Sequence, residues 1–299
     1  MPEDQKEQST APYIALIVVQ VFFGSLPVIG KVVLAHIPSL ALVGFRVGIT
    51  ALILFIFQAY RKRLWLRERG DYARLAILSL FGVTINQIFF IGGLSLTKAS
   101  NTSLLAVSIP IFTLAISVLL GTEKIRILKT VGIVLAAVGI IFLLDPRKAS
   151  FSSQTTIGDL MIIINSLAFG IYVATSKDIV TRNGAFRSMM WVFIFASVIC
   201  VPLGAYSLST IDVSAVGSMI WLLIIYIGVF ATAVPYLLNA WALARVSPST
   251  LAVFIYLQPL IGFVLAVVFL GEVIDLKFLI AAVLVFAGVF LATRKQIHT

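Results

Sequence analysis

Residues 13–34 read YIALIVVQVFFGSLPVIGKVVL, an apolar run in which Lys31 is the one charged residue. The hydrocarbon core of a bilayer is about 30 Å thick, and a helix of roughly 20 apolar residues crosses it. The run therefore predicts a membrane-spanning helix. Charged residues such as Glu3 and Lys6 precede it and no small-residue cleavage site follows it, so we interpret it as a retained span and not as a signal peptide.

Runs of the same kind recur along the whole chain, separated by short polar or charged segments. They predict ten spans, at residues 13–34, 38–60, 73–95, 100–121, 127–144, 157–176, 189–209, 216–240, 248–270 and 276–293. The composition agrees, because 61% of the residues are hydrophobic and 11% are charged, against about 25% charged in soluble domains. The runs lack the short alternating pattern of barrel strands. We therefore expect an all-α integral membrane protein, which excludes soluble enzymes and nucleic-acid binders.

The distribution of basic residues predicts the orientation in the membrane. If the N-terminus is inside, sixteen of the 22 Lys and Arg residues fall in inner segments, with the densest cluster at 61–74, and five fall in outer segments. Basic residues concentrate on the cytoplasmic side of membrane proteins. The net charge of +10 therefore reflects topology, and we expect both termini in the cytoplasm and the chain in the inner (plasma) membrane.

The two halves of the chain resemble each other. FGSLPVIGK at residues 23–31 pairs with FGIYVATSK at residues 169–177. Further collinear matches at a nearly constant spacing are Gly82 with Gly228, Lys98-Ala99-Ser100 with Arg245-Val246-Ser247, Pro110 with Pro259, Glu123 with Glu272 and Gly139 with Gly288. A collinear set that includes rare residues indicates an internal duplication.

Each copy contains five spans, an odd number, so the second copy must be inverted relative to the first. Inverted repeats around a site near the midplane recur in secondary transporters, and duplication for assembly alone is the alternative. The predicted organisation is an N-terminal tail (1–12), a five-helix repeat (13–146), a linker (147–156), a second five-helix repeat (157–293) and a C-terminal tail (294–299).

Three stretches of the sequence carry a resemblance to a known family. The first runs from Phe23-Gly24 to Gly44-Phe45-Arg46, the second from LTKASNTSLL at 96–105 to Gly139, and the third from ALARVS at 242–247 to Gly288. Together they resemble the drug/metabolite transporter superfamily, of the type that carries two EamA domains, and the amino-acid exporters within it. The resemblance covers nearly the whole chain.

The resemblance implies a ten-helix exporter with both termini inside the cell. In such proteins spans 1–4 and 6–9 surround a central cavity, while spans 5 and 10 pack at the side. The sequence departs from the repeat in two places. Ala281 stands where the first copy has Gly132, and the seventh span has no counterpart of Arg46.

Arg46 lies about eight positions into the second span, where an unpaired charge costs about 2.5–3.5 kcal/mol on insertion scales. Gly44 and Gly48 flank it at a spacing that lets another helix approach closely, which favours an arginine that faces the protein interior. Two interpretations stay open at this point. Arg46 forms a structural ion pair with Glu272 or Asp159, or it binds a substrate carboxylate in a bidentate manner.

Neutral polar side chains are plentiful in spans 1, 3, 6, 8 and 9. They either bond between helices or line a wet cavity, and their concentration in these spans favours a cavity. Together with Arg46, the candidate substrate-binding residues are Gln20, Asn86, Gln87, Tyr172, Tyr236, Asn239, Tyr256 and Gln258, and Asn165 and Thr232 belong to the same polar set.

Six residues are candidates for hinges or gates. Pro110 and Pro259 lie within equivalent spans, where a proline removes a backbone donor and kinks a helix. For the others, anchoring in the headgroups or local ion pairing is the alternative; they are Lys31, Lys177, Glu123 and Glu272, all at helix ends.

Signatures of enzymes and cofactors are absent from the sequence. No G-x-S-x-G, H-E-x-x-H or phosphate-binding glycine loop occurs. His36 and His298 are far apart and give no basis for a zinc site, and the single Cys200 excludes an internal disulfide. No Asp or Glu lies in the middle of a predicted span, which argues against a buried carboxylate proton relay. We expect no metal and no cofactor.

The leading hypothesis is a secondary transporter that exports small amphipathic metabolites by alternating access. Amino acids, aromatic or otherwise apolar, are the first substrate class. An organic-cation or drug exporter is the alternative within transport, and the lack of a buried acid argues against it. A non-transporting membrane scaffold is the alternative outside transport. The expected partners are a small-molecule substrate and the lipid bilayer, without nucleic acid; the sequence does not indicate an oligomeric state.

Overall fold

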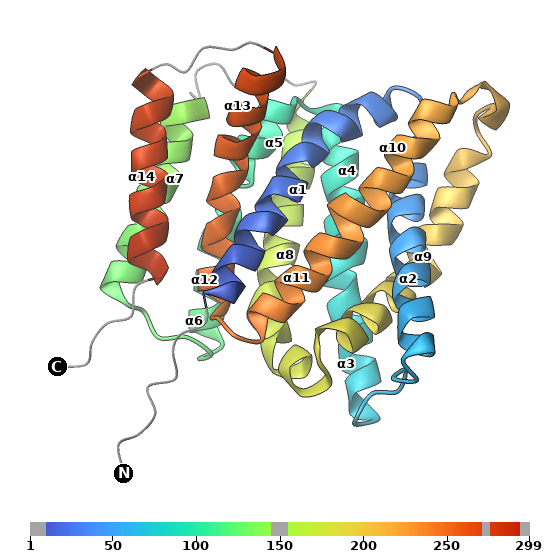
Figure 1. Ribbon diagram of the computed structural model, residues 1–299, viewed down its shortest axis with the longest axis horizontal. Coiled ribbons are helices and arrows are strands. Elements are labelled where there is room, and N and C mark those ends of the chain that lie inside the picture. The colour runs from blue at the N-terminus through green and yellow to red at the C-terminus, as the bar shows by residue number, and fades with distance from the viewer. Residues whose placement is uncertain (1–9, 145–154, 271–275, 294–299) are drawn as a thin grey trace.

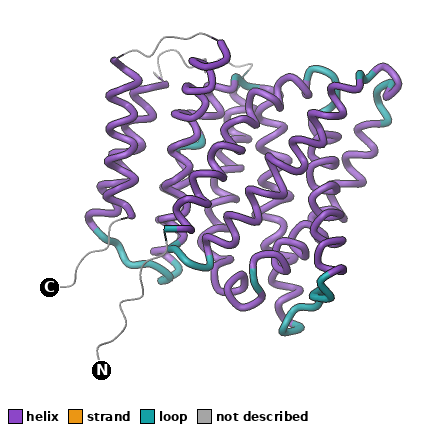
Figure 2. Tube along the Cα trace, viewed as in Figure 1, coloured by secondary structure: helices purple, strands orange, loops and turns teal. Residues whose placement is uncertain are grey.

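The computed structural model is all-helical in the residues that it describes, 10–144, 155–270 and 276–293 (Figures 1 and 2). Within them, 8 helical segments are long and apolar enough to cross a membrane. Two shorter apolar helices, Ile127–Leu143 and Pro248–Val264, occupy the positions of the fifth and ninth predicted spans. The prediction of an all-α membrane protein with ten spans is therefore confirmed.

The first repeat makes five passes, and its third and fourth passes are each built from more than one helical element. In chain order the elements are α1 (Ala11–Leu34), α2 (Ser39–Tyr60), α3 (Gly70–Ser79), the π-helical segment η1 (Leu80–Ile85), α4 (Asn86–Leu96), α5 (Ala99–Leu105), α6 (Ser108–Leu119) and α7 (Ile127–Leu144).

The second repeat has the same plan, with its third and fourth passes interrupted in the same way. Its elements are α8 (Thr156–Asn183), α9 (Ala185–Leu208), a short 3-10 turn η3 (Val213–Ala215), α10 (Ser218–Gly228), the π-helical segment η4 (Val229–Ala233), α11 (Val234–Leu243), α12 (Pro248–Val253), the 3-10 turn η5 (Phe254–Tyr256), α13 (Leu257–Leu270) and α14 (Leu276–Thr293).

The equivalent interruptions correct the register of the repeat. Lys98 directly precedes α5 and has an extended backbone conformation, with φ −80° and ψ 148°. Ser247 directly precedes α12 and has the same conformation, with φ −76° and ψ 154°. They are therefore the equivalent pair, and the sequence-based match of Lys98 with Arg245 is wrong by two residues. The reason is that the connection after α11 is two residues longer than the connection after α4.

Helix α8 is longer than the sequence predicts. The predicted sixth span ends at residue 176 and the seventh begins at 189, because charged residues lie between them, but α8 continues to Asn183 and α9 begins at Ala185. Gly184 separates the two helices with φ +82°, a left-handed conformation that favours glycine. The extra turns of α8 bring Asp178 and Arg182 into contact with Arg74 and Asp71 near the beginning of α3.

The fifth and tenth spans pack on each other at one edge of the bundle, where α7 and α14 lie side by side (Figure 1). A Cβ atom on Gly132 would lie 2.5 Å from the carbonyl oxygen of Gly288, and one on Gly139 would lie 3.1 Å from that of Ala281. Gly132 corresponds to Ala281 and Gly139 corresponds to Gly288, so a twofold axis between the repeats converts one of these contacts into the other. Ala281 replaces a glycine where the helices lie slightly further apart, which explains this departure.

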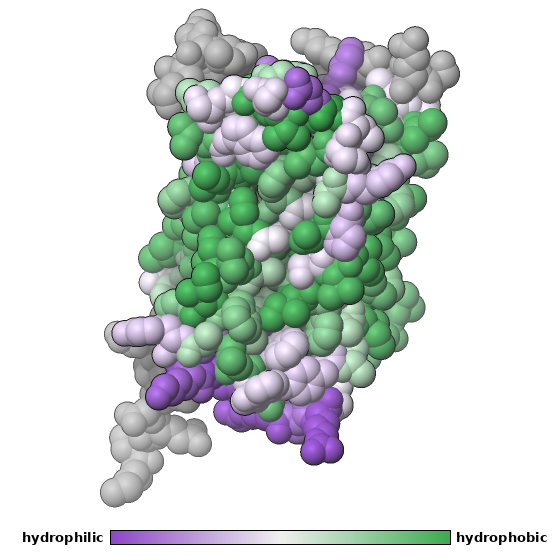
Figure 3. All heavy atoms as spheres, turned by 90° about the vertical axis from the view of Figure 1, so that its right-hand side faces the viewer, coloured by the Kyte–Doolittle hydropathy of each residue, from purple (hydrophilic) through white to green (hydrophobic). Residues whose placement is uncertain are grey.

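The surface divides into bands as a bilayer requires. On the face shown in Figure 3, apolar residues cover the middle of the molecule and hydrophilic residues gather at its two ends. Helix α1 begins and α14 ends at the same end of the bundle, the lower end in Figure 1. The exposed apolar side chains of α2, such as Leu52 and Ile56, are therefore lipid-facing rather than an unexplained patch.

Candidate functional site

A cavity lies at the centre of the bundle, between the two repeats. It contains about 610 Å³ of empty space, part of it open to solvent. Seven of the nine predicted substrate-binding residues line it. The full lining is Gln20, Phe23 and Leu26 of α1, Arg46 of α2, Asn86, Gln87 and Phe90 of α4, Ala106 between α5 and α6, Ile109 of α6, Asn165 and Phe169 of α8, Tyr236 and Asn239 of α11, Ile255 of η5 and Gln258 of α13.

Arg46 is buried, with 1% of its surface exposed, and its guanidinium reaches across to the second repeat. Its Nε donates to Thr232 Oγ1 at 3.0 Å and its Nη2 donates to the carbonyl oxygen of Ala231 at 3.3 Å. Its Nη1 has no hydrogen-bond partner. The side chain is thus oriented by η4, and one of its donors is left unsatisfied in a residue that lines the cavity.

The structural ion pairs considered for Arg46 do not occur among the described residues. Asp159 instead accepts hydrogen bonds from Thr97 Oγ1 at 2.6 Å and Asn101 Nδ2 at 3.1 Å. Glu272 lies outside the described residues. The flanking glycine acts as expected, because a Cβ on Gly44 would lie 2.9 Å from the Cα of Gly204 in α9. The close helix contact therefore lies on one side of α2 and the arginine is turned to another.

A chain of amide and phenol groups crosses the cavity. Asn86 Nδ2 donates to Asn165 Oδ1 at 2.5 Å, and Gln87 Nε2 donates to Tyr236 Oη at 2.9 Å. The Tyr236 hydroxyl has Asn86 Oδ1 at 2.9 Å and the Gly82 carbonyl at 3.0 Å as alternative acceptors. The chain links α4, α8 and α11, so it holds the two repeats together at the depth of the cavity.

A second link joins α1 to α13. Gln258 Nε2 donates to Gln20 Oε1 at 2.7 Å, and Gln20 Nε2 donates to the carbonyl oxygen of Leu16 at 3.1 Å. Asn239, in contrast, carries a buried Oδ1 without a partner. Among the described lining residues, Arg46 and Asn239 are the two with a buried unsatisfied polar atom.

Two predicted residues lie beside the cavity and not on its lining. Tyr172 packs its ring against Gly82 and directs its hydroxyl to Met189 Sδ at 3.4 Å. Tyr256 is 1% exposed and donates to the carbonyl oxygen of Val107 at 3.1 Å. Sequence reasoning did not single out the lining phenylalanines, such as Phe23 and Phe169, because apolar residues within apolar runs give no signal of their own.

Helix breaks border the cavity at equivalent positions of the repeats. The fourth span stops at Leu105 and restarts at Ser108, and the ninth passes through η5 before α13. Pro110 and Pro259 are each the third residue of the restarted helix. The predicted kinks are therefore local changes of helix geometry, a short turn at 106–107 in the fourth span and the 3-10 segment η5 in the ninth. The hydrogen bond from Tyr256 satisfies the backbone of one break from the other repeat.

The two lysine candidates make equivalent contacts at opposite ends of the molecule. Lys31 Nζ donates to the carbonyl oxygen of Thr97 at 2.7 Å, and Lys177 Nζ donates to that of Val246 at 2.7 Å. Thr97 and Val246 directly precede the equivalent residues Lys98 and Ser247. Each lysine therefore ties the first helix of one repeat to the start of a broken helix.

Glu123 connects three elements at one end of the bundle. It accepts from Lys129 Nζ at 2.9 Å, from the Ser249 backbone at 2.9 Å and from Ser249 Oγ at 2.6 Å. Burial raises the pKa of the Glu123 carboxyl, but the hydrogen bonds from Ser249 and Lys129 outweigh burial and lower its pKa below the usual value. The carboxylate thus holds α12 to the start of α7.

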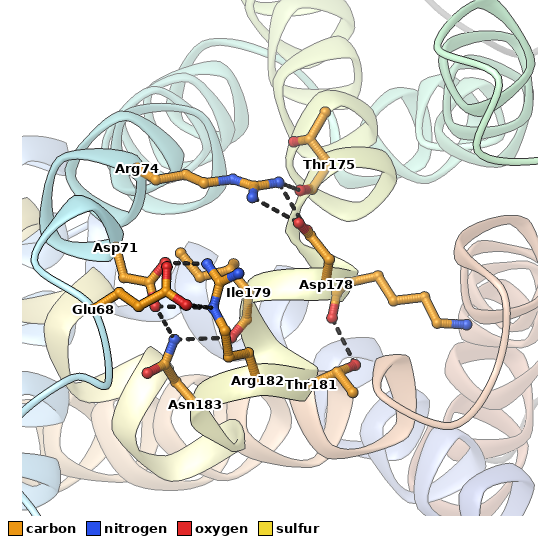
Figure 4. A network of polar contacts seen from close by, with 10 residues as sticks. Glu68, Asp71, Arg74, Thr175, Asp178, Ile179, Thr181, Arg182 and Asn183 are labelled. Carbon is orange, nitrogen blue, oxygen red and sulfur yellow. Dashed lines mark hydrogen bonds and ion pairs between the residues drawn. The ribbon is translucent and has the colours of Figure 1, made fainter.

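A polar network at the same end joins α3 to α8 (Figure 4). Asp71 pairs with the guanidinium of Arg182 and accepts from Asn183 Nδ2 at 2.7 Å, and Arg74 pairs with Asp178 at 2.6 Å. Sequence reasoning missed these links because it placed Asp178 and Arg182 in a loop. They close this end of the interface between the repeats with polar contacts.

An inverted repeat of broken helices around a polar cavity is the architecture typical of secondary transporters. The model of the EamA-like transporter family matches residues 10–145 and again residues 156–294. The chain belongs to the EamA-like transporter family. It is a multi-pass membrane transporter, whose substrate is a small molecule.

Similar proteins agree with this assignment. An uncharacterized transporter of Archaeoglobus fulgidus is 24% identical over 271 residues, which is 89% of this chain and 91% of the relative. The uncharacterized transporter YoaV of Bacillus subtilis is 25% identical over 293 residues, 94% of this chain and 96% of YoaV. The WAT1-related protein At3g53210 of Arabidopsis thaliana is 25% identical over 245 residues, 72% of this chain and 66% of the relative. None of these three names describes an enzyme.

A crystal structure of another protein shares the fold. It superposes with a TM-score of 0.76 at 20% sequence identity and covers 96% of this chain and 97% of its own. At this identity the match establishes the fold and says nothing of the substrate.

Proposed function

We propose that this protein exports small amphipathic metabolites that carry a carboxylate, with amino acids, aromatic or otherwise apolar, as the first class. Alternating access, both termini in the cytoplasm and a place in the inner (plasma) membrane are parts of the same proposal. One observation carries it: Nη1 of Arg46 is buried at the cavity without a partner, and the described lining holds no carboxylate.

The surroundings of Arg46 suit a substrate anion. A buried polar group without a hydrogen bond costs about 1–3 kcal/mol, and more when it is charged, so a ligand that satisfies it gains that energy. Thr232 and Ala231 already hold the other two nitrogens, so the guanidinium is oriented before a ligand arrives. An arginine in a fixed orientation binds a carboxylate through charge-assisted hydrogen bonds.

The alternatives fit the cavity less well. An organic cation requires a carboxylate or an aromatic cage, whereas the charged group on the described lining is an arginine. A scaffold without transport predicts polar residues at helix contacts and no cavity. The broken helices and the polar links at both ends of the bundle favour two gates that open in turn.

Purified protein in liposomes tests the proposal with labelled amino acids. We expect saturable flux of apolar or aromatic amino acids. Arg46→Gln should lose flux efficiency at least tenfold, because charge-assisted hydrogen bonds are worth about 1.5–3 kcal/mol. Arg46→Lys should show a partial loss. Arg245→Gln is the control, because Arg245 is exposed and stacks on Trp241 outside the cavity. Flux of quaternary amines but of no amino acid, or of no solute at all, would favour the cation exporter or the scaffold.

A further inference from the structure

One face of the eighth span presents a row of three side chains to the centre of the molecule. Tyr236 and Asn239 are three residues apart in α11, on the same side of that helix, and Thr232 precedes them in the π-helical segment η4. Thr232 holds Arg46, and Tyr236 and Asn239 line the cavity. The row therefore begins at Thr232, beside the guanidinium of Arg46, continues past the ring of Tyr236 and ends at the amide of Asn239.

The two ends of this row carry complementary unsatisfied atoms. Nη1 of Arg46 is a charged donor without a partner, and Oδ1 of Asn239 is an acceptor without a partner. The other cavity amides are engaged, because Gln20 bonds Gln258, Asn86 bonds Asn165 and Gln87 bonds Tyr236. Buried polar atoms are satisfied in most folded proteins, so two orphans of opposite type at one cavity point to a ligand that meets both.

The separation of the two ends limits what this ligand can be. Thr232 and Asn239 are seven residues apart, which is about 10 Å along a helix axis. The carboxylate and the ammonium of an α-amino acid are attached to the same carbon, so they lie much closer together than the backbones of Thr232 and Asn239, and a longer molecule fits the row better. A carboxylate with a hydrogen-bond donor at the far end of a ring can span it.

The space between the two ends suits a ring. The Tyr236 ring meets Phe23 edge to face, with 6.0 Å between the ring centroids. Phe169 and Ile109 contribute further apolar lining. Aromatic groups prefer such edge-on and offset arrangements, which are worth about 0.5–1.5 kcal/mol beyond the burial of area.

We infer that Asn239 is a specificity residue which accepts a hydrogen bond from the distal end of an elongated aromatic carboxylate held by Arg46. The inference rests on the proposed function and adds a second recognition point to it. It predicts that two substrates that differ by one distal hydroxyl group are distinguished. Tyrosine and phenylalanine are such a pair.

Competition between labelled tyrosine and phenylalanine in liposomes that contain the full-length protein tests the inference. We expect tyrosine to be favoured in flux efficiency by about fivefold to tenfold, the range of one neutral hydrogen bond of about 1–1.5 kcal/mol. Asn239→Leu should bring this ratio close to one by weakening tyrosine transport selectively. Asn239→Asp keeps an acceptor and should keep the preference even if Asn239→Leu folds poorly.

Gln58→Leu is the matched control. Gln58 is also a buried amide with an unpartnered carbonyl oxygen, but it lies at the far end of α2 and bonds Arg63 instead of lining the cavity. Its loss should leave the ratio unchanged. Equal transport of both amino acids by the wild type, or an unchanged preference in Asn239→Leu, would overturn the role of Asn239 alone. Absence of flux for both would overturn the proposed function as well.

Discussion

At the scale of single residues, the molecule separates charges that transport can use from charges that hold helices together. Arg46 keeps an unsatisfied nitrogen at the cavity, whereas Glu123 has all its partners on neighbouring elements. Both side chains are largely buried. The difference lies in what the rest of the fold brings to them.

The lowered pKa of Glu123 has a consequence for stability. A carboxyl whose pKa is lower in the folded state contributes stability above its unfolded pKa of about 4.3 and loses it as the pH falls through the folded pKa. Glu123→Gln should lower the midpoint of thermal unfolding in detergent by about 4–8 °C at pH 7, for a loss of about 2 kcal/mol. The difference in unfolding midpoint between Glu123→Gln and wild type should shrink as the pH falls below the pKa of an ordinary glutamate.

Glu68→Gln is the control for this measurement. Glu68 also faces an arginine, Arg182, but at 3.8 Å and with 62% of its side chain exposed. Exposed pairs contribute about 0–1 kcal/mol, so this variant should unfold close to wild type at every pH. An equal effect of both substitutions would contradict the role of the Glu123 cluster.

At the scale of helical elements, the breaks in the fourth and ninth spans are the features that distinguish this bundle from ten straight helices. Each break is followed by a proline and borders the cavity, and the two are related by the repeat. In the first break, the backbone N–H of Ile109 donates to the carbonyl oxygen of Ala106 three residues earlier, which is a tighter turn than that of an α-helix. Because proline has no backbone donor, the helix cannot repair the break.

Replacing Pro110 or Pro259 with alanine should therefore change transport more than folding. The new backbone donor allows a continuous helix through the break, which stiffens a hinge. We expect normal yield and size-exclusion behaviour together with an at least twofold change in the flux rate per molecule. Pro202→Ala is the control, since Pro202 lies within α9 on an exposed face of that helix. Wild-type flux in both Pro110→Ala and Pro259→Ala would show that these prolines are not hinges.

At the scale of the whole molecule, much of the architecture could be predicted because the membrane constrains it. Ten apolar runs predict the spans, and the collinear matches between the two halves predict the inverted repeat. The end of α8 and the register at Ser247 could not be predicted, because helix length beyond the membrane and loop length leave no hydrophobic signal. The row from Arg46 to Asn239 depends on how η4 packs against α2 and on which face of α11 lines the cavity, and that is decided only in the packed structure.

The central claim is that a carboxylate substrate occupies the cavity and that the cavity opens to each side of the membrane in turn. Cys200 is the one cysteine of the chain, so Ile109→Cys in a Cys200→Ala background places a single accessible thiol at the cavity. The measurement is its rate of reaction with an impermeant thiol reagent, applied from either side of membrane vesicles. We predict reaction from both sides, slowed by a transported amino acid and not slowed when Arg46→Gln is added. Reaction from one side alone, with no protection by any carboxylate, would contradict the claim.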